Sequence, residues 1–238
     1  MTLEARELTK TYRNRSVVCR LSLSVDRGQI VGLLGPNGAG KTTMFYMMIG
    51  FISSEGGRVL LDGKDISRFP FFRRARLGIG YLPQEPSVFT QATVSQNMDL
   101  AMEWTPKRRV DATQRDELLA EFGLLSLSGQ LAGSLSSGER RRLEIARTLA
   151  TRPHHVLLDE PFSGIDPISI ADLQQQILSL RARSIGVVIT DHNVRDTLSI
   201  TDSAILIDRG RPVAQGSPQE ILSDPEARRV YLGEGFRP

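Results

Sequence analysis

Apolar and polar residues alternate at the start of the chain and then give way to short apolar runs. Residues 3–12 and 16–25 alternate as half-buried strands do. The run QIVGLLG at 29–35 predicts a short buried strand, after which come a glycine-rich turn and a helix. The segment GRVLLDGKDI at 57–66 predicts a further strand and turn.

Helical spacing dominates from Val94 to Ala150, and then strands and helices alternate again. The later elements are predicted as strands at 154–159 and 186–191, a helix at 168–180, a hairpin over 203–216 that turns at Arg209 and Gly210, and short helices in the tail at 218–238. Strands that alternate with helices predict an α/β fold with a mostly parallel sheet covered on both faces. The interposed helical block predicts a second lobe.

Composition narrows the class of protein without naming it. A chain of 238 residues that is 40% hydrophobic and 24% charged can bury a sizeable core. Its 30 basic and 27 acidic residues leave a net charge of +3 spread along the chain, which does not single out nucleic acid and fits an anionic membrane surface equally well. The single Cys19 is expected to fill a strand, without an internal disulfide, in a reducing compartment.

Membrane spans and secretory signals are not expected. The longest apolar stretch, at 43–52, is shorter than the roughly 18 residues that a span needs. The N-terminus is charged from its fourth residue and lacks an apolar signal region. Membrane association is therefore expected only through a partner.

The stretch GPNGAGKTT, which follows the buried strand and opens a helix, carries a phosphate-binding pattern. Gly35, Gly40, Lys41 and Thr42 satisfy GxxxxGK[ST], in which backbone N–H groups curl around phosphate oxygens. Lys41 is expected at the β- and γ-phosphates, Thr42 at Mg²⁺ and Thr43 at the α-phosphate. The predicted nucleotide-binding residues of this loop are Asn37, Gly38, Ala39, Gly40, Lys41, Thr42 and Thr43.

Acidic residues and a histidine follow two other predicted strands. Asp159 and Glu160 end the strand in VLLDE, at the sheet edge where the phosphate loop also lies. Asp159 is predicted to hold the metal and Glu160 to activate the attacking water. In GVVITDHN, His192 is placed to sense the γ-phosphate. Taken alone, VLLDE also fits a helix cap or turn, and His192 fits an ordinary loop histidine.

The motifs GPNGAGKTT, YLPQ, LSSGE, VLLDE, SGID and TDHN, in this order, resemble those of the ATP-binding-cassette (ABC) ATPases over nearly the whole chain. The resemblance implies a single ABC ATPase domain: a P-loop NTPase (RecA-like) core and N-terminal antiparallel β subdomain at 1–85 and 152–238, with an inserted α-helical signature subdomain at 86–151. It implies ATP and Mg²⁺ as cofactors and a catalytic and metal-binding role for Gln84. It also implies that Tyr12 stacks on adenine, although Tyr12 also fits a locally packed strand residue.

The stretch LSSGERRR, residues 135–142, fits a basic patch, a solvated helix face or half of a binding site. S-x-x-E before an apolar-periodic run predicts a capped helix N-terminus that can bind an anion, with Arg140–Arg142 on the outside of the helix. In the family this signature motif meets ATP held by the opposite subunit, which implies a homodimer. The residues expected to act across the dimer are Ser136, Ser137, Gly138, Glu139 and Asp166. Ser137 stands where glycine is usual, and it would be strained only at a positive φ.

Longer strings, among them GERRRLEIAR, DEPFSGIDPISI and TDHNVRDTL, resemble the ATPase subunits of lipopolysaccharide exporters, the LptB family. That resemblance implies a cytoplasmic protein on the face of the bacterial inner membrane, two membrane-spanning permease subunits, a single-span component and lipopolysaccharide as indirect cargo, with no nucleic acid. It places Phe89 in the groove that receives a permease helix, although Phe89 also fits a lobe-core aromatic. Arg73, Arg74 and Arg76 are expected on a solvated helix face.

Three other functions remain open at this level. The ATPases of branched-chain amino-acid importers have tails that end in a similar YLG string, but GERRRLEIAR and TDHNVRDTL favour the exporter. DNA-repair and chromosome-structure ABC ATPases usually carry a coiled coil, zinc-binding cysteines or a second cassette, none of which occurs in this sequence. A regulatory module that holds ATP without turnover is disfavoured by Glu160 and His192.

Overall fold

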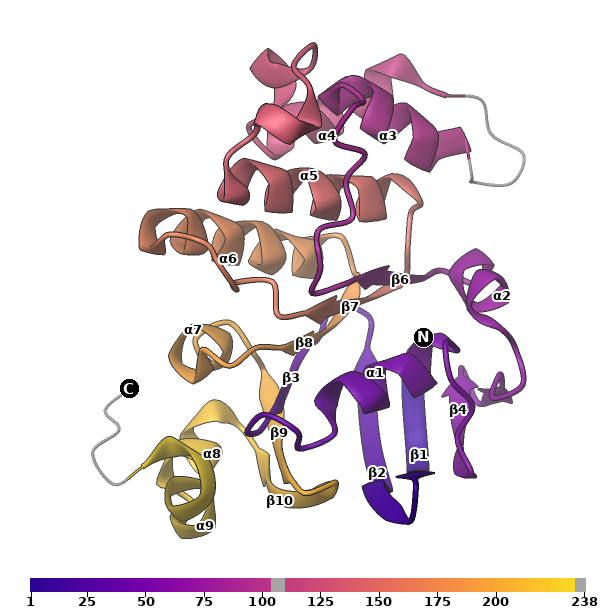
Figure 1. The fold of residues 1–238 in the computed structure, drawn as a ribbon, viewed down its shortest axis with the longest axis vertical. Helices are drawn as coiled ribbons and strands as arrows, with labels where there is room; N and C mark the ends of the chain where they lie inside the picture. The colour runs from indigo at the N-terminus through magenta and orange to yellow at the C-terminus, as the bar shows by residue number, and fades with distance from the viewer. Residues whose placement is uncertain (104–109, 234–238) are drawn as a thin grey trace.

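The computed structural model describes residues 1–103 and 110–233, which form two β-sheets and a set of helices (Figure 1). The strands are β1 (Thr2–Tyr12), β2 (Arg15–Asp26), β3 (Ile30–Leu34), β4 (Gly56–Leu61), β5 (Lys64–Asp65), β6 (Ile79–Leu82), β7 (His155–Asp159), β8 (Gly186–Thr190), β9 (Ser203–Asp208) and β10 (Arg211–Gly216). The helices and helical turns are α1 (Lys41–Ile49), α2 (Phe71–Arg76), α3 (Val94–Glu103), α4 (Ala112–Glu121), η1 (Leu125–Leu127), η2 (Ala132–Ser134), α5 (Ser137–Ala150), α6 (Pro167–Ala182), α7 (Val194–Leu198), α8 (Pro218–Ser223), α9 (Pro225–Ala227) and η3 (Arg228–Leu232). Parts of the predicted helical block and tail, at 104–109 and 234–238, lie outside the described residues.

The larger sheet is the mostly parallel one that the alternation of strands and helices predicts. Its strand order is β10-β9-β3-β8-β7-β6, and all neighbours are parallel except β9 and β10. Every residue of β3, β7 and β8 is buried, because layers of structure cover both faces of a parallel sheet. The predicted α/β fold is confirmed.

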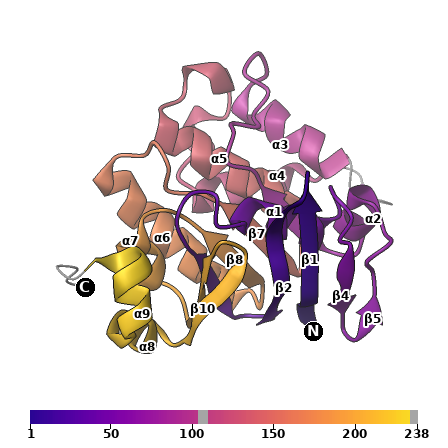
Figure 2. The same ribbon diagram turned by 60° about the horizontal axis from the view of Figure 1, so that its bottom comes forward.

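The smaller sheet is antiparallel and packs with α1 against one face of the larger sheet. Its strand order is β2-β1-β4-β5, and Figure 2 shows its strands side by side. Phe45 and Met48 of α1 share one apolar cluster with Leu3 and Leu23 of this sheet and with Val31 of β3. This cluster fixes the start of α1 at the end of β3.

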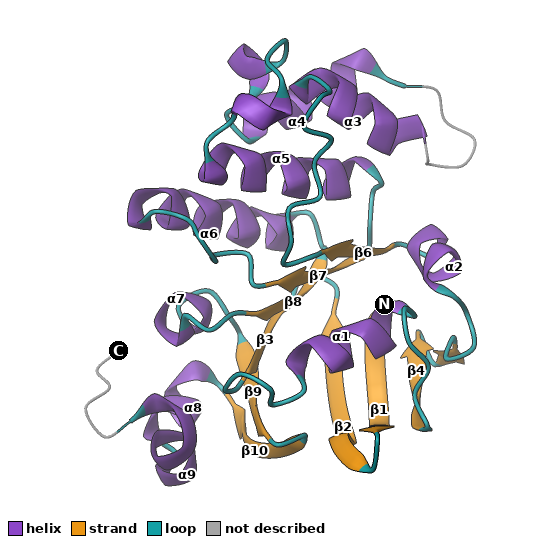
Figure 3. Cartoon of the chain, viewed as in Figure 1, coloured by secondary structure: helices purple, strands orange, loops and turns teal. Residues whose placement is uncertain are grey.

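The other face of the larger sheet is covered by α5 and α6, and α3 and α4 pack beyond α5 (Figure 3). Leu143 and Ile145 of α5 and Leu173 of α6 are buried in one cluster with Val156 and Val187 from the sheet. The cluster holds α5 against the sheet whose strand ends carry the candidate acids. None of the helices within 1–103 and 110–233 combines the length and apolar character of a membrane span.

The predicted hairpin forms with the expected turn. Arg209 (φ 46°) and Gly210 (φ 77°) both adopt left-handed conformations, as a two-residue turn of the primed type requires. By contrast, the short strand β6 was not predicted, since IGYL is only four residues long.

The prediction that Arg74 lies on a solvated helix face is wrong. Only 2% of its surface is exposed. Its guanidinium donates hydrogen bonds of 2.7–2.8 Å to the carbonyl oxygens of Phe69, Met47, Met48 and Ser67. These four acceptors come from the end of α1 and from the segment before α2, so only the tertiary structure could have identified them.

Candidate nucleotide-binding and hydrolysis site

The loop between β3 and α1 requires its glycines. Gly40 has φ 110°, and a Cβ on it would lie 2.6 Å from the carbonyl oxygen of Val17. Gly35 has φ 150°, and a Cβ there would lie 2.2 Å from the carbonyl oxygen of Ile207. By contrast, a Cβ on Gly38 would meet no described atom within 4 Å, so a ligand can approach the backbone at this point.

Lys41 folds back over this loop. Its Nζ donates hydrogen bonds to the carbonyl oxygens of Gly35 (2.8 Å) and Pro36 (3.2 Å), and burial lowers the pKa of Lys41. Thr42 and Thr43 lie in the first turn of α1, whose N-terminus has no side-chain cap. An ammonium whose hydrogen bonds to described residues all go to carbonyl oxygens, and that lies beside N–H groups without a side-chain cap, can take phosphate oxygens as partners.

Of the remaining predicted nucleotide contacts, Asn37 and Tyr12 lie at the surface and Ala39 is buried. Asn37 is exposed, and Ala39 is buried and accepts a hydrogen bond of 2.8 Å from Gly210. Tyr12 ends β1 with 46% of its surface exposed, and the Lys10 ammonium lies 5.4 Å from the centre of its ring. The exposure argues against a packed strand tyrosine, and adenine stacking stays a prediction.

Asp159 ends β7, and only 1% of its surface is exposed. Its Oδ2 accepts a hydrogen bond of 3.1 Å from the Tyr81 hydroxyl, whereas its Oδ1 is buried and has no hydrogen-bond partner among the described residues. Burial raises the pKa of Asp159 to about 6, although the Tyr81 hydrogen bond and the charge of Lys41 act in the opposite direction. An orphaned buried carboxylate oxygen is a natural ligand for a cation.

Sequence reasoning did not identify Tyr81. It lies on β6, opposite Leu157 of the neighbouring strand β7, so its hydroxyl reaches Asp159 across the sheet. The YLPQ string contains this tyrosine, but only the pairing of β6 with β7 reveals its partner.

The three predicted catalytic residues meet at one carboxylate oxygen. Gln84 Nε2 donates a hydrogen bond of 2.9 Å to Glu160 Oε2, and His192 Nδ1 lies 3.4 Å from the same atom. Gln84 follows β6, Glu160 follows β7 and His192 follows β8, so adjacent parallel strands deliver them to one edge. Glu160 has φ 47°, an uncommon and strained value for a residue with a side chain.

A buried aspartate, Asp191, connects the two loops that carry Glu160 and His192. Its Oδ2 accepts a hydrogen bond from Phe162 N and its Oδ1 accepts one from Asn193 N, both 2.9 Å long. Burial raises the pKa of Asp191, and these two hydrogen bonds oppose that shift. The TDHN string contains Asp191, but its buried position was not predicted.

The LSSGE stretch forms the predicted capped helix start. Glu139 N donates to Ser136 Oγ (3.3 Å) and Ser136 N donates to Glu139 Oε2 (2.8 Å), which completes a capping box at the start of α5. Ser137 is the first residue of α5 and is not among the positions with positive φ, so serine introduces no strain there.

Gly138 and Asp166 tie this helix start to the next helix. A Cβ on Gly138 would lie 2.8 Å from Ser169 Oγ, so α6 can approach α5 closely only at a glycine. Asp166 caps α6 by accepting a hydrogen bond of 3.0 Å from Ser169 N, and hydrogen bonding with the side chain and then the backbone of Ser169 lowers the pKa of Asp166. Because α5 and α1 cover opposite faces of the larger sheet, the capped start of α5 and the phosphate loop belong to different layers of one chain.

The expectation that Arg140–Arg142 all lie on the outside of α5 is wrong for Arg141, which is buried. Phe89 is not a lobe-core aromatic, since 53% of its surface is exposed. The Arg147 guanidinium lies 5.0 Å from the centre of the Phe89 ring and donates a hydrogen bond of 2.7 Å to the carbonyl oxygen of Ser87. The groove role of Phe89 stays a prediction.

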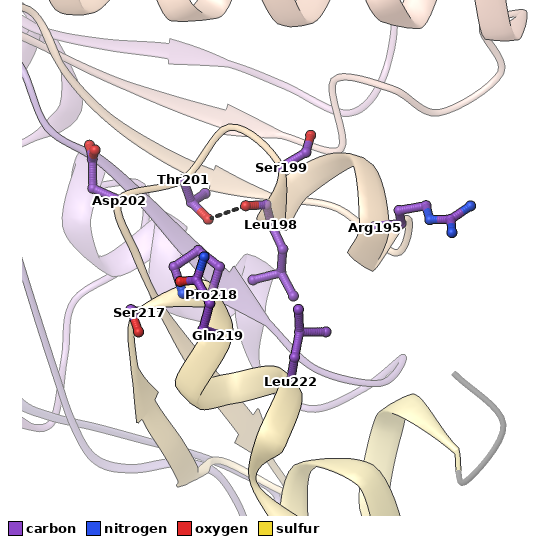
Figure 4. A pocket seen from close by; sticks show the side chains of 9 residues that line it. All are labelled: Arg195, Leu198, Ser199, Thr201, Asp202, Ser217, Pro218, Gln219 and Leu222. Atoms are coloured by element: carbon purple, nitrogen blue, oxygen red, sulfur yellow. Dashed lines mark hydrogen bonds between the residues drawn. The ribbon is translucent and has the colours of Figure 1, made fainter. Parts of the chain in front are cut away.

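Of two hollows in the surface of the described residues, one is lined in part by predicted site residues and the other is not. One of about 90 Å³ is lined in part by Gln84, Ser137 and Arg141. The other, of about 420 Å³, lies between α7 and α8, with Asp202 and Gln219 in its lining (Figure 4). None of the described residues that line this larger hollow is a predicted site residue.

Comparison with known proteins places the chain in a family. Residues 18–163 match the family model described as "ABC transporter", and residues 211–237 match that of the branched-chain amino acid ATP-binding cassette transporter. The chain is 52% identical over 236 residues, 99% of this chain and 98% of the relative, to "Lipopolysaccharide export system ATP-binding protein LptB" of Acidithiobacillus ferridurans. It is 48% identical to the protein of the same name from Haemophilus influenzae, with the same two coverages.

A solved structure agrees with these matches. The crystal structure of the ADP conformation of an ATP-binding cassette of an ABC transporter superposes with a TM-score of 0.88 at 28% identity, covering 98% of this chain and 100% of that one. The chain therefore belongs to the ABC transporter family and is an ATP-binding-cassette ATPase that binds nucleotide.

Proposed function

We propose that this ATPase is the subunit that powers lipopolysaccharide export from the bacterial inner membrane. The support is a sequence identity of 48–52%, over nearly the full length of the chain, to relatives that bear the name of that export system. In this proposal two copies of the chain attach at the cytoplasmic face to two permease subunits and a single-span component. Lipopolysaccharide is then the cargo of the permeases and does not contact this chain.

The phosphate loop holds ATP in this proposal. Lys41 exchanges its two carbonyl partners for β- and γ-phosphate oxygens, and the N–H groups from Asn37 to Gly40 surround the phosphates, with Thr43 at the α-phosphate. The exposed ring of Tyr12 stacks on adenine.

The residues present also suit Mg²⁺. Asp159 Oδ1 is a buried oxygen without a partner, and hydroxyl, amide and carboxylate oxygens are the ligands that Mg²⁺ prefers. Thr42, Gln84 and Asp159 would hold the ion directly or through water, and a bound ion would neutralise charge that develops on the phosphates. Tyr81 keeps the Asp159 carboxylate oriented through its hydrogen bond.

Hydrolysis is assigned to the cluster around Glu160, which is the observation that carries the mechanism. Glu160 accepts a proton from the attacking water, and Gln84 fixes the orientation of its carboxylate by donating to Oε2. His192, which lies beside the same oxygen, is positioned to hydrogen-bond the terminal phosphate. The three groups therefore meet where the water and the terminal phosphate have to be aligned.

Two copies complete the site. Ser136, Ser137, Gly138 and Glu139 form the capped start of α5, and one chain supplies one such start and one phosphate loop. Head-to-tail pairing lets each helix start, with the adjacent Asp166, meet ATP on the other copy. Binding of ATP then closes the pair and hydrolysis reopens it, while exposed Phe89 contacts a permease helix.

Copurification from detergent-solubilised membranes, with identification of the bound subunits and lipid, tests the transporter assignment. The proposal expects two different permease subunits, a single-span protein and lipopolysaccharide. Permeases of the amino-acid type would overturn it in favour of the alternative that the match at 211–237 supports. Retention of DNA in place of membrane subunits would instead indicate a DNA-repair or chromosome-structure ATPase.

A further inference from the structure

Arg141, in the second turn of α5, places a buried guanidinium directly beneath the hydrolysis cluster. Its Nη2 donates to the carbonyl oxygens of Asp159 (2.9 Å) and Glu160 (3.2 Å), and its Nε donates to that of Pro161 (3.3 Å). Its Nη1 donates to the carbonyl oxygen of Pro83 at 2.8 Å. One side chain thus holds the backbone on both sides of the Gln84–Glu160 contact.

Glu144, one turn further along α5, completes this arrangement. Its Oε2 accepts a hydrogen bond of 2.9 Å from Arg141 Nη1, and its Oε1 accepts hydrogen bonds from the backbone and hydroxyl of Ser87. The side chains of Arg141 and Glu144 are 8% and 2% exposed, so the two residues form an ion pair that is largely shielded from water. The pair holds the loop that carries Gln84 at its first residue, Pro83, and again at Ser87.

The backbone of Glu160 is strained, so the hydrogen bonds that hold it determine where its side chain lies. A side-chain-bearing residue persists in the left-handed region only when its surroundings fix it. Glu160 is fixed through its N–H, which donates to the carbonyl oxygen of Thr190 at 2.7 Å, and through its own carbonyl oxygen, which Arg141 holds. The same carbonyl oxygen also accepts a hydrogen bond of 3.2 Å from Ser163 N, so loss of Arg141 would weaken this second restraint without removing it.

We infer that Arg141 and Glu144 are positioning residues for ATP hydrolysis, which hold Gln84 and Glu160 in register with the helix start that carries Ser136. The inference rests on the proposed roles of Gln84 and Glu160. Because Arg141 and Ser136 belong to the same helix, a shift of α5 on contact with another copy moves the backbone of both catalytic residues. The buried pair thereby links dimer closure to alignment of the catalytic groups.

Arg74 provides a matched control. It is also a buried arginine that donates to four backbone carbonyl oxygens, but its acceptors lie at the end of α1 and before α2. Arg74→Gln therefore removes a comparable set of hydrogen bonds away from the hydrolysis cluster. Comparison with it separates a general loss of stability from misplacement of Gln84 and Glu160.

The test compares three variants of the full chain below their unfolding temperatures. Arg141→Gln combined with Glu144→Gln removes both charges together, and Arg141→Lys keeps the charge but loses the planar fork. For the double variant we expect kcat to fall by about ten-fold or more while the Kd for a fluorescent ATP analogue stays within about two-fold, and for Arg141→Lys a smaller fall in kcat. Arg74→Gln should keep kcat within about two-fold of the parent chain.

The inference is overturned if the double variant loses no more kcat than Arg74→Gln, or if ATP affinity falls in proportion to kcat. If the double variant does not fold, Arg141→Lys decides the matter, and a kcat equal to that of the parent chain contradicts the inference. Glu160→Gln is measured beside them. Turnover retained in Glu160→Gln would refute the proposed function itself, whereas turnover lost there and kept in the double variant would refute only the positioning role.

Discussion

Gln84 Nε2 donates a hydrogen bond of 2.9 Å to Glu160 Oε2, and this contact joins the loops after two adjacent strands, β6 and β7. His192 from the loop after β8 lies 3.4 Å from the same oxygen. The carboxylate is thereby oriented from two sides before any nucleotide arrives. We expect preorganisation of this kind to act on the chemical step more than on the affinity for ATP.

His192→Ala tests that expectation. The variant removes a group that is largely solvent-exposed and caps no helix, so the fold should persist. We expect kcat to fall by about 100-fold with an ATP dissociation constant close to that of the parent chain. Steady-state hydrolysis and equilibrium nucleotide binding measure the two quantities, and an equal loss of affinity and turnover would show that His192 acts mainly in binding.

Ser136→Arg tests whether the capped start of α5 acts on ATP held by another copy. A bulky cation at this position blocks the approach of a second copy, so hydrolysis should fall by about 100-fold or more while single-chain nucleotide binding is kept. Ser217 and Glu220 form a capping box with the same hydrogen bonds at the start of α8, and neither is a predicted site residue. Ser217→Arg therefore controls for the loss of a cap, and similar turnover in both variants would contradict a role for Ser136 between copies.

Asp159→Asn should stabilise the nucleotide-free chain at neutral pH. The folded pKa of Asp159, about 6, lies above its ordinary value of 3.8, so the folded chain binds more protons between these values. Stability is therefore lost as pH rises through about 6, by about 2–3 kcal/mol for the buried carboxylate. Asparagine carries no such charge, and we expect the melting temperature at about pH 7.5 to rise by about 5 °C.

The same comparison at lower pH supplies the check on sign. The difference between Asp159→Asn and the parent chain should shrink as the pH falls below about 6 and become small at about pH 3, where the carboxyl is mostly protonated in both the folded and unfolded states. Asp172→Asn, at an exposed position on α6, should change the melting temperature by about 1 °C or less. Identical melting of the Asp159 variant and the parent chain at about pH 7.5 would show that burial imposes no penalty on this carboxylate.

Local features of this chain could be predicted because short segments determine them. The Arg209–Gly210 turn, the capping box at Ser136 and the glycines of the phosphate loop each follow from residues that are adjacent in sequence. The convergence of Asp159, Glu160 and His192 also followed, since parallel strands end at one edge.

The arginines could not be predicted in the same way. Arg74 and Arg141 each reach carbonyl oxygens from segments distant in sequence, so helix periodicity alone assigned them to the surface. The contact of Tyr81 with Asp159 likewise depends on the pairing of β6 with β7. Such contacts emerge only when the whole chain has been folded.

Turnover of Glu160→Gln tests the central claim most directly. The carboxamide keeps the size of the side chain but cannot accept the proton of the attacking water. We predict that the variant binds ATP, accumulates as a closed dimer in size-exclusion chromatography with ATP, and hydrolyses it about 100-fold or more slowly than the parent chain. Hydrolysis at the parental rate, with no ATP-dependent dimer, would contradict the account.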